Sequence, residues 1–381
     1  MNLATGAHRM KRTQCIALVL LVLIVARFSG RIPVVNGGFD DVGARNQDDI
    51  RIGVLGLFHP KQLIVRAPSG EALVLRGGDQ SVVLEDSGIP SATATLGDSE
   101  LVVSSGTQVM RATVVQIAGR ENQPVDFVLE IPGKIIRSYH GVLEVKASAD
   151  DLCAIVTLDL ETAVASVLAA ESAADTPLEA LKAYAIAARS YFVSGRGRHK
   201  AFDFCDTTHC QFLRTPPSSS SRMAKAVADT RGQVLSYQGR SFAAMYTRSC
   251  SGRTRTPSEL GLKLAAYPYY PVECEHCRVH PAYWTSRITS RDALSLQAGD
   301  ESNRLAIDHR LGWSAVPSND FSQKKEGDSV LLKGIGSGHG IGLCQAGAKA
   351  MAEKGATFLQ ILDHYYPNTN VVSYSGQESR R

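Results

Sequence analysis

The spacing of apolar residues changes near residue 160, from short runs rich in β-branched residues to alanine-rich segments with helical periodicity. Between Ile52 and Val145 the runs are separated by Gly, Pro and Ser, which is the pattern of strands and turns. The clearest runs are residues 51–55, 62–65 and 112–115. We therefore expect an α+β protein in which a β-rich N-terminal region precedes a mixed core of helices and strands.

Two helices are predicted directly after this change. The first covers about residues 161–170, and Glu171 follows Val164 by seven positions, on the same apolar face. The second begins with Thr176, Pro177 and Glu179, whose spacing is that of a capping box with proline at the first helical position. Its apolar residues recur three and four apart and predict one buried stripe: Leu178, Leu181, Ala185, Ala188 and Phe192.

Further elements are predicted in the C-terminal half. Residues 223–229, 345–354 and 358–364 have helical spacing, and residues 233–247 predict a hairpin that turns at Gln238 and Gly239. Residues 372–381 form a polar tail. The folded chain then divides into a β-rich region, residues 49–138, and a second domain, residues 139–371.

An apolar run near the N-terminus predicts export. Arg9, Lys11 and Arg12 precede an uninterrupted apolar segment over residues 15–26, which is shorter than the roughly 20 residues of a spanning helix. No small-x-small cleavage site follows. Residues 1–30 are therefore expected to be a signal peptide or an uncleaved membrane anchor, and residues 31–48 a linker. We expect an exported, extracytoplasmic protein, anchored to the membrane or secreted to the cell wall or periplasm.

The composition is that of an ordinary globular protein, with 44% hydrophobic and 20% charged residues. A formal net charge of +4 does not require nucleic acid, and we expect no such partner. Eight cysteines, less Cys15 in the leader, leave seven, so disulfides alone cannot pair them all. At least one thiol must stay free, bind metal or pair between chains.

Two groups of residues have side chains that bind metals. The first lies within twelve residues and is a sufficient tetrahedral set for a structural zinc ion, although its spacing is not that of a standard zinc finger. Its members are His199, Cys205, His209 and Cys210. The second contains a Cys-x-x-Cys, which could bind metal, form a disulfide or perform redox chemistry, and we favour a structural role. Its members are Cys250, Cys274, Glu275, His276, Cys277 and His280.

A glycine-rich loop over residues 334–347 carries a single histidine, His339. Five glycines at alternate positions allow the backbone to approach a ligand closely or to adopt positive φ. We expect His339 to hydrogen-bond a substrate there, with a packed histidine in a tight turn as the alternative. The Lys-Ser/Thr pair of a phosphate-binding P-loop is absent.

Glu171 is the strongest candidate for acid–base chemistry. A carboxylate at the end of an apolar helix face would be partly desolvated, and its pKa should rise. Such a carboxyl group can donate a proton to a glycosidic oxygen near neutral pH. A solvated, inert glutamate at a frayed helix end is the other interpretation of the same spacing.

Taken together, several of these segments resemble the SpoIID/LytB domain of stage II sporulation protein D and amidase-enhancer proteins. The resemblance rests on residues 139–145, on Glu171 and the helix up to Tyr191, on the loop 338–345, and on residues 351–352 and 361–367. It implies that Glu171 is the catalytic acid and base of a peptidoglycan lytic transglycosylase, which cleaves the MurNAc–GlcNAc bond of glycan strands lacking stem peptides. It also implies that the group from His199 to Cys210 is a zinc site.

The resemblance further implies contacts with peptidoglycan glycan strands, a wall amidase and, through the N-terminal segment, the membrane. Lys182 and Arg189 could equally orient Glu171 or pair with carboxylates, and Arg189 could be buried in a salt bridge. The full set expected to bind the glycan is Lys182, Arg189, Tyr191, Gly338, His339, Gly340 and Gln345. The main rival is a non-catalytic glycan-binding enhancer of an N-acetylmuramoyl-L-alanine amidase. A zinc-dependent hydrolase is disfavoured because four protein ligands leave zinc no open position.

The sequence departs from the family pattern in three places. Residues 247–252 stand where the family often has a His-Ser-x-Cys/Ser-Gly-Gly element, so a histidine that could line the cleft is missing. Cys344 replaces the usual serine, and Ser172 follows Glu171 without the usual proline. These departures keep the glutamate and leave the details of substrate binding open.

Overall fold

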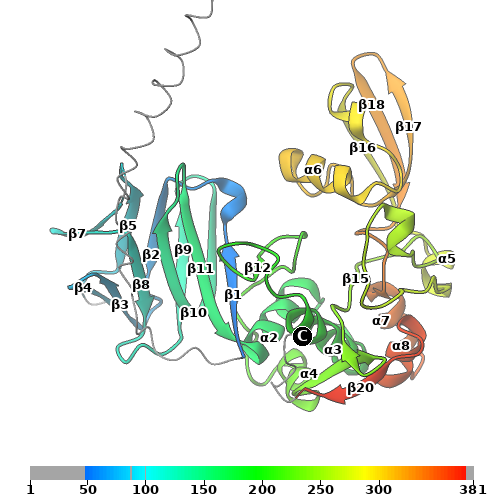
Figure 1. Ribbon diagram of the computed structural model, residues 1–381, viewed down its shortest axis with the longest axis horizontal. Coiled ribbons are helices and arrows are strands. Elements are labelled where there is room, and N and C mark those ends of the chain that lie inside the picture. The colour runs from blue at the N-terminus through cyan, green and yellow to red at the C-terminus, as the bar shows by residue number, and fades with distance from the viewer. Residues whose placement is uncertain (1–47, 86–87, 99, 375–381) are drawn as a thin grey trace, which may run out of the picture. The chain divides into compact units, whose positions relative to one another are not determined.

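The computed structural model describes residues 48–85, 88–98 and 100–374, which belong to one compact unit that begins at Asn46. The predicted leader, nearly all of the predicted linker and the end of the predicted tail lie outside the described residues. Within the described ranges, no helix is both long and apolar enough to cross a membrane. Strands come first and helices alternate with strands afterwards, which confirms the α+β prediction (Figure 1).

The strands before the first described α-helix, together with one short later strand, form a 12-stranded sheet. The predicted run over residues 112–115 is divided between two strands, because the chain bends at Thr113. The members of the sheet are β1 (Asp49–Val54), β2 (Gln62–Arg66), β3 (Ala72–Gly77), β4 (Gln80–Glu85), β5 (Ser91–Leu96), β6 (Leu101–Ser105), β7 (Gln108–Ala112), β8 (Val114–Ala118), β9 (Val125–Ile131), β10 (Ile135–Ala147), β11 (Leu152–Asp159) and β12 (Phe204–Cys205).

Strand β10 joins two parts of this sheet. Its residues 135–141 pair with β9, whereas residues 142–147 pair with β11. Gly141 lies where the partner changes, and a Cβ there would come within 2.6 Å of the carbonyl oxygen of Thr157. Only glycine allows this close approach. The expected domain boundary between residues 138 and 139 therefore falls inside a continuous strand.

A group of helices packs around α3 (Figure 1). Nearly all of residues 180–192 are buried, Lys182 being the exception, so α3 is a central helix rather than a helix with one buried stripe. The residues of the predicted stripe are buried apart from the half-buried Leu178, but burial extends beyond the stripe because several elements cover α3 from different sides. The helices are α2 (Leu160–Glu171), α3 (Leu178–Ser194), α4 (Arg222–Asp229), α7 (Gln345–Glu353) and α8 (Phe358–Tyr365).

The predicted capping box at the start of α3 does not form. Pro177 is the N-cap residue, and Thr176 is buried without a capping hydrogen bond. The Glu179 carboxylate instead accepts hydrogen bonds from the Phe358 amide, at 2.8 Å, and from Lys182, at 3.0 Å. The local pattern predicted that Glu179 would bond to the backbone at the start of its own helix, α3. Because α8 packs against α3, Glu179 bonds to the start of α8 instead.

Short elements complete the described chain. β13 (Gln233–Tyr237) pairs with β14 (Arg240–Ser241) and with β20 (Asn370–Ser373), so the first residues of the predicted tail belong to a strand. β15 (Tyr246–Thr247) pairs with β19 (Leu343–Cys344). The remaining elements are η1 (Gly56–Phe58), η2 (Pro257–Leu260), α5 (Glu275–Val279) and η3 (Asp292–Ser295).

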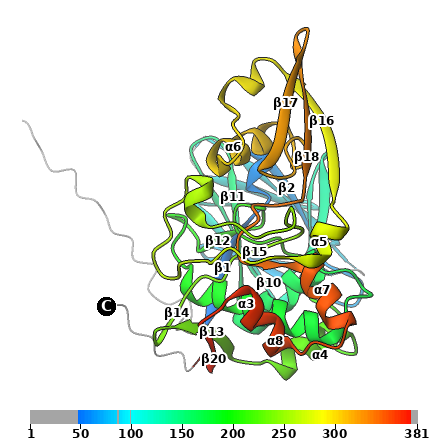
Figure 2. The same ribbon diagram turned by 90° about the vertical axis from the view of Figure 1, so that its right-hand side faces the viewer.

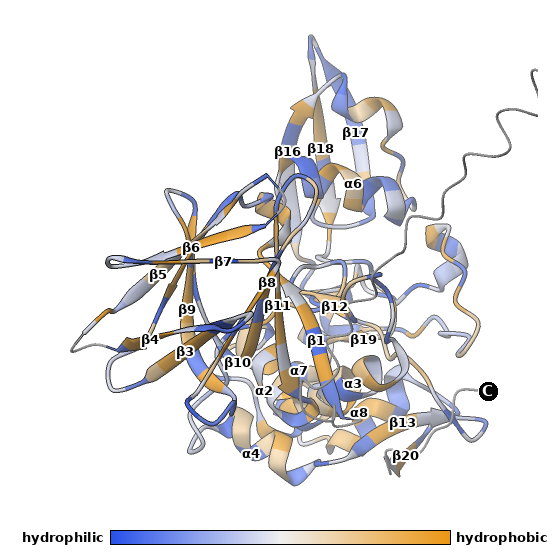
Figure 3. Ribbon diagram, turned by 60° about the vertical axis from the view of Figure 1, so that its left-hand side comes forward, coloured by the Kyte–Doolittle hydropathy of each residue, from blue (hydrophilic) through white to orange (hydrophobic). Residues whose placement is uncertain are grey.

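Residues 283–335, called here the outer segment, form a small sheet with its own apolar cluster. Its strands are β16 (Tyr283–Thr289), β17 (Asp320–Glu326) and β18 (Ser329–Ile335), and its helix is α6 (Glu301–Leu311) (Figure 2). Figure 3 shows β17 hydrophilic along most of its length, in contrast to β6 of the large sheet. An exposed edge strand explains this composition.

Candidate active site

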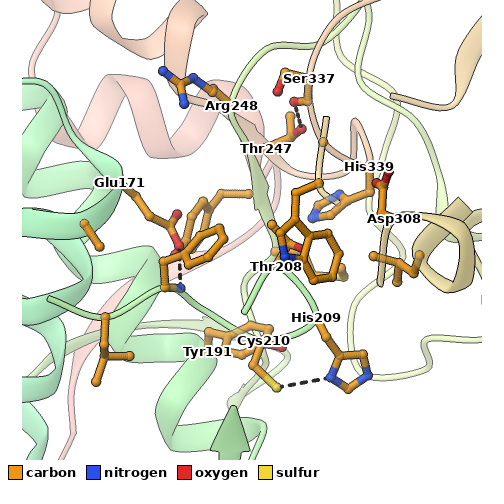
Figure 4. Close-up of a pocket in the computed structure, with 18 of the residues that line it drawn as sticks. Glu171, Tyr191, Thr208, His209, Cys210, Thr247, Arg248, Asp308, Ser337 and His339 are labelled. Atoms are coloured by element: carbon orange, nitrogen blue, oxygen red, sulfur yellow. Dashed lines mark hydrogen bonds between the residues drawn. The ribbon is translucent and has the colours of Figure 1, made fainter. Parts of the chain in front are cut away.

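An open cleft of about 1260 Å³ is lined by segments far apart in the sequence. They are the start of β10, the end of α2, the loop 208–215, residues 245–248, helix α6 and residues 337–339 (Figure 4). Small-ligand pockets measure roughly 300–1,000 Å³. The cleft is therefore large enough for several units of a polymer.

Glu171 is the last residue of α2, and its side chain points into the cleft (Figure 4). Its Oε1 accepts a hydrogen bond from the Phe212 amide at 3.0 Å. Burial raises the pKa of Glu171 to about 7. The Phe212 amide, the Tyr246 hydroxyl and the charge of Arg248 oppose this rise without cancelling it. A carboxyl group with this pKa can hold a proton at neutral pH and transfer it to a substrate.

Helix α6 carries a buried ion-pair network on the opposite side of the cleft. Arg304 donates hydrogen bonds to Glu301 and to Asp308, each at 2.7 Å. Burial raises the pKa of Asp308 to about 6 despite the nearby Arg304. Although burial also acts on Glu301, hydrogen bonding to Arg304 holds the pKa of Glu301 below its ordinary value. Figure 4 shows Asp308 across the cleft from Glu171.

The glycine loop packs closely against Thr247. The Thr247 hydroxyl donates to the Ser337 carbonyl at 2.9 Å and accepts from the Gly340 amide at 3.1 Å. Gly338 has a φ of +96°, and a Cβ there would lie 2.4 Å from the Thr247 Oγ1. The glycines of this loop therefore allow contact with β15. Thr247, within the segment 247–252, holds the loop in place through these two hydrogen bonds.

His339 lines the cleft, but its ring is bonded to the protein backbone. Its Nδ1 accepts a hydrogen bond from the Ile341 amide at 3.0 Å, and a second backbone hydrogen bond joins the ring to Tyr246. Burial lowers the pKa of His339 to about 4, so the ring is neutral at physiological pH. The geometry indicates that His339 connects the glycine loop to β15, as in the packed-histidine alternative.

The residues expected to bind glycan divide into two sets. Those that line the cleft are Tyr191, Gly338, His339 and Gln345. Those that do not line it are Lys182, Arg189 and Gly340. Lys182 pairs with Glu179 and Asp229, and the fully buried Arg189 pairs with Glu161 at 2.7 Å. For Arg189 the buried salt bridge is the arrangement found, because the guanidinium lies among α2, α4 and β13.

The first metal-binding group comes together as one cluster. Its four donor atoms lie within 4.8 Å of one another. The Cys210 sulfur is 3.4 Å from a ring nitrogen of His199 and 3.4 Å from one of His209, and the Cys205 sulfur is 3.7 Å from His209. Tetrahedral zinc with such ligands separates the donors by about 3.5–3.8 Å. The residues present therefore fit a structural zinc ion with no open position.

The same loop is fixed to the large sheet by Asp206, which the sequence did not indicate. Its buried carboxylate accepts hydrogen bonds from the Tyr139 hydroxyl at 2.9 Å, from Arg137 at 3.0 Å and from the Leu55 amide at 3.2 Å. Burial nevertheless raises the pKa of Asp206 to about 6. Asp206 thus holds the loop that contains Cys205, His209 and Cys210 against β1 and β10.

Three further cleft residues were missed by sequence reasoning. Tyr246 hydrogen-bonds to Glu171, and the positive charge of Arg248 acts on its carboxyl group. Asp308 faces Glu171 from α6. The sequence did contain one signal for Arg248, because it lies within residues 247–252, the segment compared with a family element that could line the cleft. Nothing in the local pattern around Asp308 places α6 opposite Glu171, because that arrangement depends on the tertiary fold of the outer segment.

Fold and cleft together define an α+β protein with a carboxyl group of raised pKa in a large open cleft. Residues 148–237 match the SpoIID family, described as Stage II sporulation protein. Stage II sporulation protein D of Bacillus amyloliquefaciens is 26% identical over 265 residues, 57% of this chain and 75% of that protein. An uncharacterized protein of Brachyspira hyodysenteriae is 28% identical over 271 residues, 62% of this chain and 73% of that protein.

The amidase enhancer of Bacillus subtilis is 26% identical over 282 residues, 54% of this chain. The alignment spans only 39% of the amidase enhancer's own length. These similarities agree with the match over residues 148–237 and support an assignment to the SpoIID family. The resemblance noted from the sequence is confirmed.

Proposed function

We propose that this protein has a cell-wall function and acts as a peptidoglycan lytic transglycosylase, with Glu171 as general acid and base. The observation that carries this proposal is the pKa of about 7 of Glu171 on the side of an open cleft of about 1260 Å³. The acid must hold a proton at neutral pH, and the cleft must admit a glycan strand. The family's association with sporulation and amidase enhancement supports the choice of substrate.

The reaction needs one carboxyl group. Protonated Glu171 donates its proton to the glycosidic oxygen between MurNAc and GlcNAc as that bond breaks. The C6 hydroxyl of the muramic residue then bonds to the anomeric carbon, and the Glu171 carboxylate accepts the hydroxyl proton. Because the nucleophile belongs to the substrate, the enzyme returns to its starting protonation state. The charge of Arg248 favours the carboxylate formed between the two transfers.

The alternative of a two-carboxylate hydrolase is less well supported. The acidic residues close to Glu171 in sequence, Asp175 and Glu179, pair with Lys349 and Lys182 and do not line the cleft. Asp308 lines the cleft, but Arg304 and a backbone amide occupy its carboxylate. A hydrolase would need a second carboxylate free to activate water or attack the sugar.

The same proposal includes a structural zinc ion and a location outside the cytoplasm. Zinc bound by His199, Cys205, His209 and Cys210 would stabilise the loop next to Glu171 without taking part in the reaction. The substrate lies outside the cytoplasm, so the protein is proposed to work there, with residues 1–30 as signal peptide or anchor.

The amidase enhancer relative favours one competing function, a glycan-binding module that stimulates a wall amidase without cleaving glycan itself. Such a module would use the same cleft. It would bind strands but leave their ends unchanged, and Glu171 would be dispensable for stimulation.

The two functions are separated by incubating purified denuded glycan strands with wild-type protein and with Glu171→Gln. We expect 1,6-anhydro ends from wild type, by mass analysis, and a loss of about 10²–10⁴-fold in the variant. Glu353→Gln is the matched control, because Glu353 lies on the exposed side of α7, away from the cleft. Absence of anhydro ends from wild type, or equal yields from Glu171→Gln, would refute the catalytic proposal.

A second measurement tests the enhancer. Cosedimentation with glycan and stimulation of an N-acetylmuramoyl-L-alanine amidase are compared for the same proteins. Retained stimulation by Glu171→Gln, with no anhydro ends from wild type, would support the enhancer.

A further inference from the structure

Four buried cysteines come together, one from the glycine loop and three from residues 250–277. Their sulfur atoms all lie within 4.8 Å of one another, and each residue is at most 2% exposed. They are Cys250, Cys274, Cys277 and Cys344. Sequence reasoning had grouped the first three with His276 and His280, but those histidines pack against each other outside the cluster, and Cys344 completes the set.

We propose that Cys250, Cys274, Cys277 and Cys344 bind one zinc ion as thiolates, in a second, structural metal site. All ligands come from the protein, so the ion would have no open position for substrate. The proposal concerns this cluster alone and does not depend on the reaction proposed for Glu171.

The spacing of the sulfur atoms favours a single ion. Zinc bound by four thiolates at about 2.3 Å separates the sulfurs by about 3.8 Å. The Cys277 and Cys344 sulfurs are 3.5 Å apart, and no pair in the cluster exceeds 4.8 Å. An iron–sulfur cluster places several iron and sulfide ions between its thiolates and needs a wider cage. A disulfide needs sulfurs about 2.05 Å apart, whereas all four residues are free thiols.

The surroundings of the sulfurs suit thiolates. The amides of Cys250 and Gly347 donate to the Cys344 sulfur, at 3.3 and 3.5 Å. The Tyr365 hydroxyl lies 3.5 Å from the Cys274 sulfur. Hydrogen bonds of this kind spread the negative charge of a metal–thiolate centre and fix the ligands. Cys344 is also the N-cap residue of α7, where the helix dipole favours an anionic sulfur.

Gly347 shows how tightly the chain is built around the cluster. A Cβ at this position would lie 2.5 Å from the Cys274 sulfur and 2.1 Å from the Tyr365 hydroxyl oxygen. The first turn of α7 can therefore approach the sulfurs only with glycine here.

The segment that supplies three of the ligands has little regular structure of its own. Residues 248–282 contain only the four-residue η2 and the five-residue α5. Helices this short are unstable alone. A metal ion would join the segment to α7, and its binding free energy would contribute directly to folding.

Helices α5 and α7, in or next to which the cluster's Cys274, Cys277 and Cys344 lie, are found at the base of the outer segment (Figure 2). Ser249, next to Cys250, pairs through its backbone with Ser337, just after β18. Arg248 precedes Cys250 by two residues, and Cys344 follows His339 by five. An ion here would hold the α6 side of the cleft in a fixed position relative to Glu171.

The first test measures zinc per chain by mass spectrometry in a Cys205→Ser/Cys210→Ser protein, which lacks the other metal-binding group. We expect one zinc ion per chain in this protein and none after adding Cys277→Ser. Adding Cys153→Ser instead is the control, since Cys153 is the cysteine of the described residues outside both clusters. Less than stoichiometric zinc in the double variant, or unchanged zinc after Cys277→Ser, would overturn the proposal.

A second test leaves the cluster intact, in case Cys277→Ser does not fold. The double variant is grown with cobalt, and its absorption spectrum should show the ligand-field and sulfur-to-metal bands of tetrahedral four-thiolate Co²⁺. Alkylation without reductant, after chelation and denaturation, should modify all four cysteines. Absent cobalt bands, stoichiometric iron, or disulfides among these cysteines would each contradict the zinc site.

Discussion

The Phe212 amide donates a hydrogen bond to Glu171 at 3.0 Å, across 41 positions in the sequence. Phe212 follows Cys210, one of the proposed zinc ligands, by two residues. Between them, Gln211 is buried and accepts a hydrogen bond from the Tyr246 hydroxyl at 2.9 Å. The position of the Glu171 carboxyl group therefore depends on a loop without regular structure. Whatever holds this loop also positions the proposed acid.

Loss of the first zinc site should therefore impair the reaction without removing a reacting group. Cys205→Ser is expected to lose one zinc ion per chain and to lower kcat by about 10–100-fold, with a smaller change in KM, because Cys205 does not line the cleft. Zinc analysis and steady-state kinetics measure the two effects. Cys153→Ser should change neither. Full activity in a zinc-depleted Cys205→Ser protein would show that the loop holds Glu171 without metal.

The pH dependence of cleavage should follow the pKa of Glu171. Because the reaction begins with the protonated group, kcat/KM is expected to fall as pH rises above about 7. Arg248→Gln removes a positive charge that lowers this pKa, so the fall should move to higher pH. Initial rates on glycan strands across a pH series give both curves. A fall that stays in place or moves to lower pH in Arg248→Gln would contradict the assignment of this limb to Glu171.

The stability of the folded protein should depend on pH because the pKa of Glu171 is raised. The folded state holds the Glu171 proton up to pH about 7, against an ordinary value of 4.5, so its contribution to stability is fully present below 4.5 and lost as pH rises through about 7. Glu171→Gln does not titrate. Its Tm relative to wild type should therefore be higher at about pH 8 than at about pH 5. Glu353→Gln should show no such trend, and a parallel trend in both variants would argue against a shifted Glu171.

Much of the secondary structure could be predicted because it depends on local periodicity. The helices near residues 160, 223, 345 and 358 were predicted to within a few residues. The errors arose where tertiary contacts replaced local ones. Glu179 bonds to α8 rather than capping its own helix, and α3 is covered on several sides, which no spacing in its own sequence reveals.

The candidate site was predictable only where residues share a short motif. The four residues from His199 to Cys210 were grouped correctly because they lie within one loop. Cys344 could not be joined to Cys250 from the sequence, because 94 positions separate them and tertiary contacts such as the β15–β19 pairing bring them together. Arg189 illustrates the opposite error, since its position within a family motif suggested substrate contact while its environment is a buried ion pair.

The glycine loop offers a test of packing beside the cleft. Gly342 has a φ of +69°, and a Cβ there would lie 1.9 Å from the carbonyl oxygen of Met245. That carbonyl also accepts a hydrogen bond from the Tyr366 hydroxyl at 2.6 Å, so it cannot move freely. Gly340 has a similar φ of +79°, but the nearest atom to a Cβ is 3.6 Å away, on the side chain of Arg255. A side chain at either position would thus suffer backbone strain, but only position 340 has room for a Cβ atom.

Gly340→Ala is therefore expected to lower the free energy of unfolding by about 1–2 kcal/mol, the cost of a left-handed conformation for alanine. Gly342→Ala should cost about 3 kcal/mol or more, because the Met245 carbonyl must also shift. Urea unfolding of both variants measures the difference. Displacement of Met245 would in turn move Tyr246, so Gly342→Ala should also lower the cleavage rate more than Gly340→Ala. Equal losses of stability would mean that strain in φ, rather than contact with Met245, accounts for the glycine at position 342.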